Sequence, residues 1–179
     1  ADALTILEKF GTLDVNLMYI GAKNNVFNSH VEFFSKMKKG TLYGLTPLVN
    51  ETACGPDFYE EAKKSGHYIE LDPSMSMEEA KEYANKMDVL YTDTWVDMEF
   101  FNNPAYQKQK EETLAKMMPY QLNGDFTKDS KAIVFHDMPM HVGFEISQDV
   151  VDKNLDHILD EAENRRHAEK AVMYTLLNS

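Results

Sequence analysis

The sequence predicts an α/β fold, with an open, mostly parallel five-stranded sheet and helices on both faces (Rossmann-like). Short apolar runs of strand length alternate along the chain with longer segments whose apolar residues recur at helical spacing. Such alternation is typical of a parallel sheet that is covered on both sides. Of the 179 residues, 43% are hydrophobic, which is enough for a real core. We therefore expect a single α/β domain over residues 1–179.

The first half of the chain supplies three of the expected strands. Leu4, Leu7 and Phe10 lie at helical spacing and predict an opening helix that ends at Gly11. The expected strands are 17–20, 42–45 and 68–71, and the helices between them are 26–37 and 57–64.

The second half supplies the other two strands. Ser76, with Glu79 three residues later, predicts a capped helix to about residue 86. Strands are expected at 89–92 and 133–135, with a helix from about 104 to 118 between them. Near the end, Ser147 is expected to cap a short helix, 157–159 to be extended, and 162–177 to form the closing helix.

Bulk properties exclude several classes of function. The net charge of −12 argues against a nucleic-acid partner, which would require a basic face. Cys54 is the single cysteine, so no internal disulfide is possible, and a reducing cytoplasm is the expected location. No run of 18 apolar residues predicts a membrane span, and the N-terminus does not resemble a signal peptide. The chain opens inside a helical pattern without Met, which predicts that it is a piece of a longer protein.

Ligands of open parallel sheets bind beyond the carboxyl ends of the strands. The first such end, Gly21–Val26, is not the G-x-G-x-x-G fingerprint of a dinucleotide site. Within this segment, Asn24 and Asn25 lie at a helix start. They are either helix caps or amides that contact a ligand.

The end of the fourth strand is rich in carboxylates. Asp93, Asp97 and Glu99 lie within seven residues, together with Met98. They are surface acids of a loop, a pocket for an amine or cation, or a metal site. The metal interpretation is the weakest, since the spacing matches no EF-hand loop.

The end of the fifth strand carries His136, Asp137, Met138 and Pro139. A histidine on an apolar strand is often structural, but at the end of the strand it can donate to an oxyanion or shuttle a proton. We expect Pro139 to hold Met138 in extended geometry, so that its carbonyl can accept a hydrogen bond from a substrate NH₂.

Arg165 is expected near the start of the closing helix. The helix dipole disfavours a cation there. This indicates a task such as binding a phosphate or carbonyl oxygen, the alternative being an ordinary surface arginine.

Together these segments resemble the second half of the ornithine/aspartate carbamoyltransferase superfamily, over essentially the whole chain. The most specific match is Asp160–Arg165 followed by His167–Ala171. The other matching segments are Ala3–Gly11, Gly21–Val26, Tyr91–Trp95 and His136–Pro139.

The resemblance implies transfer of a carbamoyl group from carbamoyl phosphate to an amine or amino acid, without metal or organic cofactor. It implies that Asn25 and Asp93 hold the amine, and that His136 and Arg165 bind the carbamoyl oxygen. The Met138 carbonyl would hold the carbamoyl NH₂. The acceptor would also meet Asp97, Met98, Asp137 and Pro139. The full-length chain would form a trimer-based homo-oligomer.

Departures from the family pattern concern the acceptor. Asp97-Met98-Glu99 stands where ornithine enzymes have Ser-Met-Gly, and Asp137 stands where they have Cys. The Pro-Leu-Pro-Arg signature of the aspartate enzymes is absent after His136. The chain therefore looks closer to the uncharacterised carbamoyltransferase-like branch, with an acceptor such as a diamine or a ureido or amidine compound.

The family's phosphate-binding motifs, Ser-x-Arg-Thr-Arg and His-Pro-x-Gln, do not occur in the sequence. We expect this chain to be the acceptor half, without the carbamoyl phosphate domain, and to be inactive alone. Two other classes stay open: a non-catalytic amine or amino-acid binding module, and a scaffold partner of a catalytic homologue.

Overall fold

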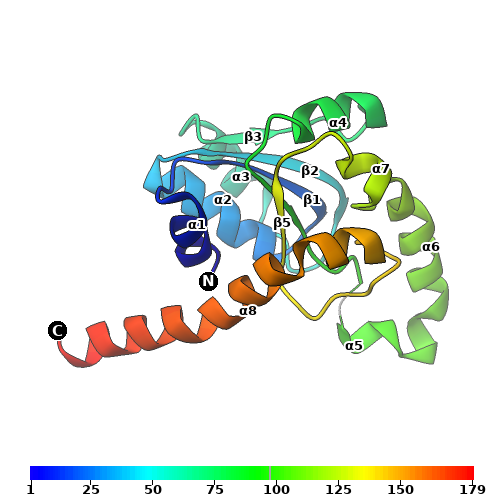
Figure 1. Cartoon of the computed structure of the whole chain (residues 1–179). Coiled ribbons are helices and arrows are strands. Elements are labelled where there is room, and N and C mark those ends of the chain that lie inside the picture. Colours follow the sequence, from blue (N-terminus) through cyan, green and yellow to red (C-terminus); the bar gives the residue numbers. More distant parts are fainter. Residues whose placement is uncertain (97) are drawn as a thin grey trace.

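A computed structural model gives the fold of residues 1–96 and 98–179, with the backbone alone for Met98 and Glu99. Five parallel strands form one sheet in the order β3-β2-β1-β4-β5 (Figure 1). The strands are β1 (Asn16–Lys23), β2 (Thr41–Val49), β3 (Tyr68–Glu70), β4 (Val89–Thr92) and β5 (Ile133–His136). The α/β fold and the five predicted strands are confirmed.

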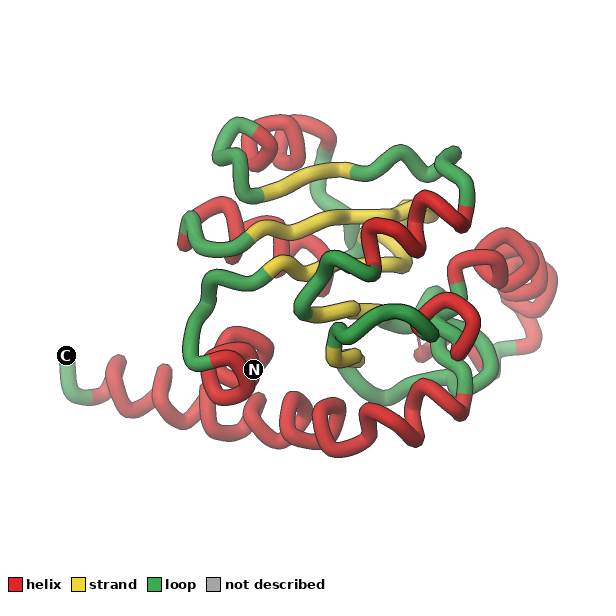
Figure 2. Tube along the Cα trace, turned by 45° about the horizontal axis from the view of Figure 1, so that its top comes forward, coloured by secondary structure: helices red, strands yellow, loops and turns green. Residues whose placement is uncertain are grey.

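Helices cover both faces of the sheet, as predicted (Figure 2). One layer holds α1 (Asp2–Phe10), α2 (Asn25–Met37) and α3 (Pro56–Lys63). The other holds α4 (Met77–Ala84), α7 (Gly124–Thr127) and the first part of α8 (Gln148–Leu177). Two further helices, α5 (Met98–Phe101) and α6 (Gln107–Met117), lie between β4 and α7 along the chain.

Successive residues of β1 explain the two layers, since side chains of a strand point alternately to opposite faces. Leu17 and Tyr19 belong to the core under α1–α3, whereas Met18 and Ile20 belong to the core on the other face. All four are fully buried. Burying each such side chain contributes roughly 1.5–3 kcal/mol, so the central strand is a rigid base for the residues that follow it.

The order of the strands reverses at β1. From β1 the chain moves to β2 and β3 on one side, then returns to place β4 and β5 on the other. The connections after β1 and β4 therefore leave the sheet in different directions and open a crevice beyond their carboxyl ends, which is where α/β sheets bind ligands.

The end of the chain differs from its prediction. A single helix, α8, runs from Gln148 to Leu177, so there is no extended piece at 157–159 and no separate closing helix. The segment contains neither proline nor glycine, and Ile158 packs into the core from a helical position. The second half of α8 projects from the body (Figure 1). It exposes Val172, Met173, Tyr174, Leu176 and Leu177.

The connection between β4 and β5 contains more helix than predicted. The expected helix near 104–118 is confirmed as α6, with a 3₁₀ turn at each end (Pro104–Tyr106 and Met118–Tyr120). Neither α5 nor α7 was predicted. Asn123 caps α7 by accepting from the N–H groups of Asp125 and Phe126, and this cap was a readable signal.

Candidate functional site

A hollow of about 200 Å³ lies beyond the carboxyl ends of β1, β4 and β5, at the reversal of strand order. It brings together five of the predicted site residues, Asn25, Asp93, Asp137, Met138 and Pro139. The other lining residues are Asn24, Val26 and Thr94. The expected meeting of side chains from three strand ends is therefore present for these residues.

Asp93 is the fixed centre of the hollow. Its Oδ2 accepts from the side-chain amide of Asn24 at 2.7 Å, and its Oδ1 accepts from the N–H of Thr94 at 2.7 Å. Only 8% of the residue is exposed. Both oxygens of this carboxyl group are therefore held in place by donors from the protein.

The two asparagines after β1 have different roles. Asn24 is buried, and its Oδ1 accepts from the N–H of Phe27 at 2.9 Å, so it caps α2 as well as binding Asp93. Asn25 is exposed on the rim of the hollow. The capping interpretation thus holds for Asn24.

The side chain of Asp137 is half-buried and has no hydrogen-bond partner within the described part of the chain. Burial raises its pKa to about 6, and the charges of Asp93 and Asp2 add to the rise. The positive charge of Arg165 opposes it. The hollow therefore contains one carboxylate fixed by hydrogen bonds and a second one without such bonds.

His136 is fully buried, and both ring nitrogens are bonded within the protein. Nδ1 accepts from the N–H of Met138 at 3.0 Å, which assigns the ring proton to Nε2, 3.1 Å from Oε1 of Glu145. Glu145 is itself buried and also accepts from the N–H of His141. Glu145 was not among the predicted site residues. The signal that could have found it is a glutamate directly beside an apolar residue, Ile146, which is buried.

Met138 corrects one expectation. Its φ is 30°, so its backbone is not extended ahead of Pro139 as predicted. The reason is local: the N–H of Met138 turns back to the ring of His136, two residues earlier. Both Met138 and Pro139 nevertheless line the hollow.

Arg165 does not lie near a helix start, because α8 begins at Gln148. The dipole argument for this residue was therefore wrong. Its side chain is 74% exposed and donates to Glu169 at 3.0 Å. It is not among the residues that line the hollow, but its charge still reaches Asp137.

Asp97 and the side chain of Met98 lie outside the described residues, so their predicted contacts stay predictions. Described residues on either side of Asp97 pack against the rest of the protein. Trp95 is buried, and the ring of Phe101 stacks on His141 at a centroid distance of 3.5 Å. Because His141 and His136 share Glu145, Phe101 is connected to the end of β5.

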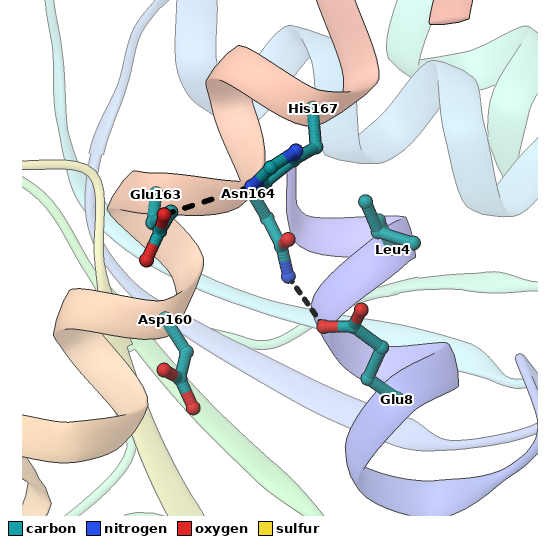
Figure 3. Close-up of a pocket in the computed structure, with 6 residues that line it drawn as sticks. All are labelled: Leu4, Glu8, Asp160, Glu163, Asn164 and His167. Carbon is teal, nitrogen blue, oxygen red and sulfur yellow. Dashed lines mark hydrogen bonds and ion pairs between the residues drawn. The ribbon is translucent and has the colours of Figure 1, made fainter.

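A second hollow, of about 520 Å³, lies between α1 and α8 (Figure 3). Some of its polar groups contact each other: Asn164 donates to Glu8 at 2.7 Å, and His167 lies 3.6 Å from Glu163. Leu4 and Asp160 complete the lining. None of the predicted site residues appears among these described lining residues, so we place the site at the strand ends.

The strand-end hollow suits a small cation. It carries two carboxylates, and no lysine or arginine appears among its described lining residues.

Within the described part of the chain, no three His, Cys, Asp or Glu side chains are grouped to hold a metal ion. No described helix is both long and apolar enough to cross a membrane.

A Rossmann-like sheet with a polar hollow where the strand order reverses is typical of the small-molecule-binding domain of an α/β protein. Residues 13–176 match the family model "Aspartate/ornithine carbamoyltransferase, Asp/Orn binding domain". The chain belongs to this family.

Relatives and solved structures agree. An ornithine carbamoyltransferase from Chlorobaculum tepidum is 34% identical over 99% of the chain and 50% of its own length. The structure of the ornithine carbamoyltransferase from Pyrococcus furiosus has a TM-score of 0.77 and 30% identity, covering 96% of this chain and 53% of that one. An anabolic ornithine carbamoyltransferase from Campylobacter jejuni has a TM-score of 0.80 and 25% identity, covering 99% and 56%. The chain spans about half the length of these relatives.

Proposed function

We propose that this chain is the acceptor-binding half of a carbamoyltransferase and that the acceptor's amino group binds in the strand-end hollow. The observation that carries this proposal is the Asn24–Asp93 pair. It fixes a buried carboxylate at the carboxyl end of β4, beside the rim residue Asn25. A carboxylate held in this way is a ready counter-ion for an ammonium group.

The acceptor we propose is more cationic than an α-amino acid, such as a diamine or an amidine. Asp93 and Asp137 both face the hollow, and its described lining offers no basic side chain for a carboxylate. An ammonium–carboxylate pair at ~4 Å gains about 4 kcal/mol at an effective dielectric constant of 20, and an α-carboxylate in the same place is repelled by a similar amount. This would place the protein apart from the ornithine enzymes in substrate, although its relatives carry that name.

At the carbamoyl end we propose the contacts that the family resemblance implies. Arg165 would leave Glu169 to bind the carbamoyl oxygen, and the Met138 carbonyl would accept from the carbamoyl NH₂. His136 would contribute by exchanging one of its present hydrogen bonds. The partial exposure of Met138 and the exposure of Arg165 support this arrangement.

We further propose that the carbamoyl phosphate domain belongs to the part of the protein outside this chain. The coverage of about half of each relative supports this. The 179-residue chain alone is then inactive, and detectable carbamoylation by the purified chain would refute the proposal.

The test uses the natural full-length protein. Binding of diamines and of L-ornithine is measured by calorimetry, and carbamoyl transfer from carbamoyl phosphate is measured by phosphate release. We expect diamines to bind more tightly and to be carbamoylated. Equal or better affinity for L-ornithine rejects the acceptor assignment, and amine binding without any transfer identifies a non-catalytic binding module instead.

A further inference from the structure

An amine acceptor must lose a proton before it can react. In water near neutral pH an alkylamine is an ammonium ion, whose nitrogen has no lone pair to attack a carbonyl carbon. A site that holds the ammonium ion with carboxylates therefore needs a group that accepts one of its protons. The strand-end hollow offers two carboxylates for these two tasks.

Asp93 is unsuited to accept the proton. Its two oxygens already accept from Asn24 and Thr94, each at 2.7 Å. Protonation of Asp93 would weaken one of these bonds inside a buried environment. The geometry of Asp93 therefore suits a counter-ion and not a proton acceptor.

Asp137 has the opposite environment. It is half-buried on the same hollow, and within the described part of the chain no donor holds its oxygens. The titratable and charged groups around it come from several elements: Asp93 after β4, Asp2 from α1, His136 on β5, and Glu161 and Arg165 on α8. Burial and the charges of Asp93 and Asp2 raise the pKa of Asp137 to about 6, which leaves it ionised at neutral pH but easily protonated. A site can give two carboxyl groups different acid–base roles by placing them in different environments.

We propose that Asp137 is the general base that takes a proton from the acceptor's ammonium group, while Asp93 remains its ionised counter-ion. This inference rests on the proposed function. Asp137 gains the proton, and the freed nitrogen lone pair forms a bond to the carbonyl carbon of carbamoyl phosphate. The bond from that carbon to the bridging oxygen breaks, and phosphate leaves with the electron pair. The second nitrogen proton passes to the leaving phosphate.

The first experiment compares the full-length protein with its Asp137→Asn variant. We expect kcat for a diamine to fall by roughly 10²-fold or more, with a much smaller change in KM. The wild-type kcat/KM, which reports the free enzyme, should decline as the pH is lowered through about 6, and this acidic limb should be absent from the variant. The variant is expected to fold, because it removes a charge whose ionisation is disfavoured by burial.

The second experiment separates a base from a residue that merely shapes the hollow. An O-alkyl hydroxylamine is neutral near neutral pH and needs no base. We expect the Asp137→Asn variant to carbamoylate the hydroxylamine at a rate close to that of the wild type. Loss of activity that is equal for both acceptors, or an acidic limb that persists in the variant, overturns the role of Asp137. A wild-type protein that carbamoylates no amine would instead refute the proposed function itself.

Discussion

At the scale of single residues, the neighbouring asparagines at the end of β1 show how position decides role. Asn24 is buried between the start of α2 and Asp93, whereas Asn25 is exposed beside it. The sequence predicts that one or both lie at a helix start. It does not contain the contact of Asn24 with Asp93, which joins residues far apart in the chain.

The pair gives a matched test of stability. We expect Asn24→Ala to lower the free energy of unfolding by about 1–3 kcal/mol, because it removes the cap of α2 and a hydrogen bond to a buried carboxylate. Asn25→Ala should change it by no more than about 0.5 kcal/mol. Urea denaturation of both variants measures the difference, and equal effects contradict the assigned roles.

His136 shows why the carbamoyl end of the site was harder to predict. The sequence places a histidine at the end of β5, but this residue does not line the hollow, and its partners Glu145 and Met138 come from the segment that follows. A hydrogen-bonded histidine whose two nitrogens are both occupied looks the same in the sequence as a free one.

At the scale of elements, α8 is the clearest departure from expectation. The run His157-Ile158-Leu159 is as apolar as a short strand, which favoured an extended piece. Helical packing decides otherwise, because Ile158 falls on the buried stripe of α8 and Leu159 does not. Local composition did not contain that long-range contact.

The continuity of α8 predicts that replacing two neighbouring side chains by alanine lowers the free energy of unfolding by unequal amounts. Ile158 is fully buried, so Ile158→Ala should cost about 2–5 kcal/mol of stability. Leu159 is 48% exposed, and Leu159→Ala should cost far less. Thermal and urea unfolding measure both. Similar losses for the two variants would indicate that the segment is not packed as a helix.

The contact of α1 with α8 contains a buried acid. Glu161 is 2% exposed, and burial, together with a hydrogen bond and the charge of neighbouring Asp2, raises its pKa to about 9. The protonated form donates to Asp2. The ionised form leaves Oε2 without a partner among the described residues.

This acid predicts a pH dependence of stability. The pKa in the folded state exceeds the unfolded value of 4.5, so the folded state binds the proton more tightly. The stabilisation is fully present below pH 4.5 and is lost as the pH rises through about 9. We expect Glu161→Gln to flatten the fall in melting temperature across this range, whereas Glu163→Gln, at an exposed position of the same helix, leaves it unchanged. A wild-type curve that rises with pH over this interval contradicts the assignment.

At the scale of the whole molecule, the position of the hollow follows from the rule that open parallel sheets bind ligands beyond the carboxyl ends of their strands. Alternating strands and helices predicted the parallel sheet, and the sheet predicted that residues after β1, β4 and β5 would share one edge. The order of strands was not predictable from the pattern, yet it decides which ends are adjacent. It places β1 beside β4 and thereby brings Asn24 to Asp93.

The exposed half of α8 also belongs to this scale. Val172, Tyr174, Leu176 and Leu177 are all more than half exposed, and Arg165 lies on the same helix. We propose that these side chains meet the other half of the full-length protein.

The most direct test of the account is calorimetric binding of 1,4-diaminobutane to the full-length protein and to its Asp93→Asn variant. If the carboxylate that Asn24 holds is the counter-ion of the acceptor, the variant should bind at least about 10-fold more weakly, corresponding to roughly 1.4 kcal/mol. Unchanged affinity in a variant that folds normally would show that the acceptor binds elsewhere.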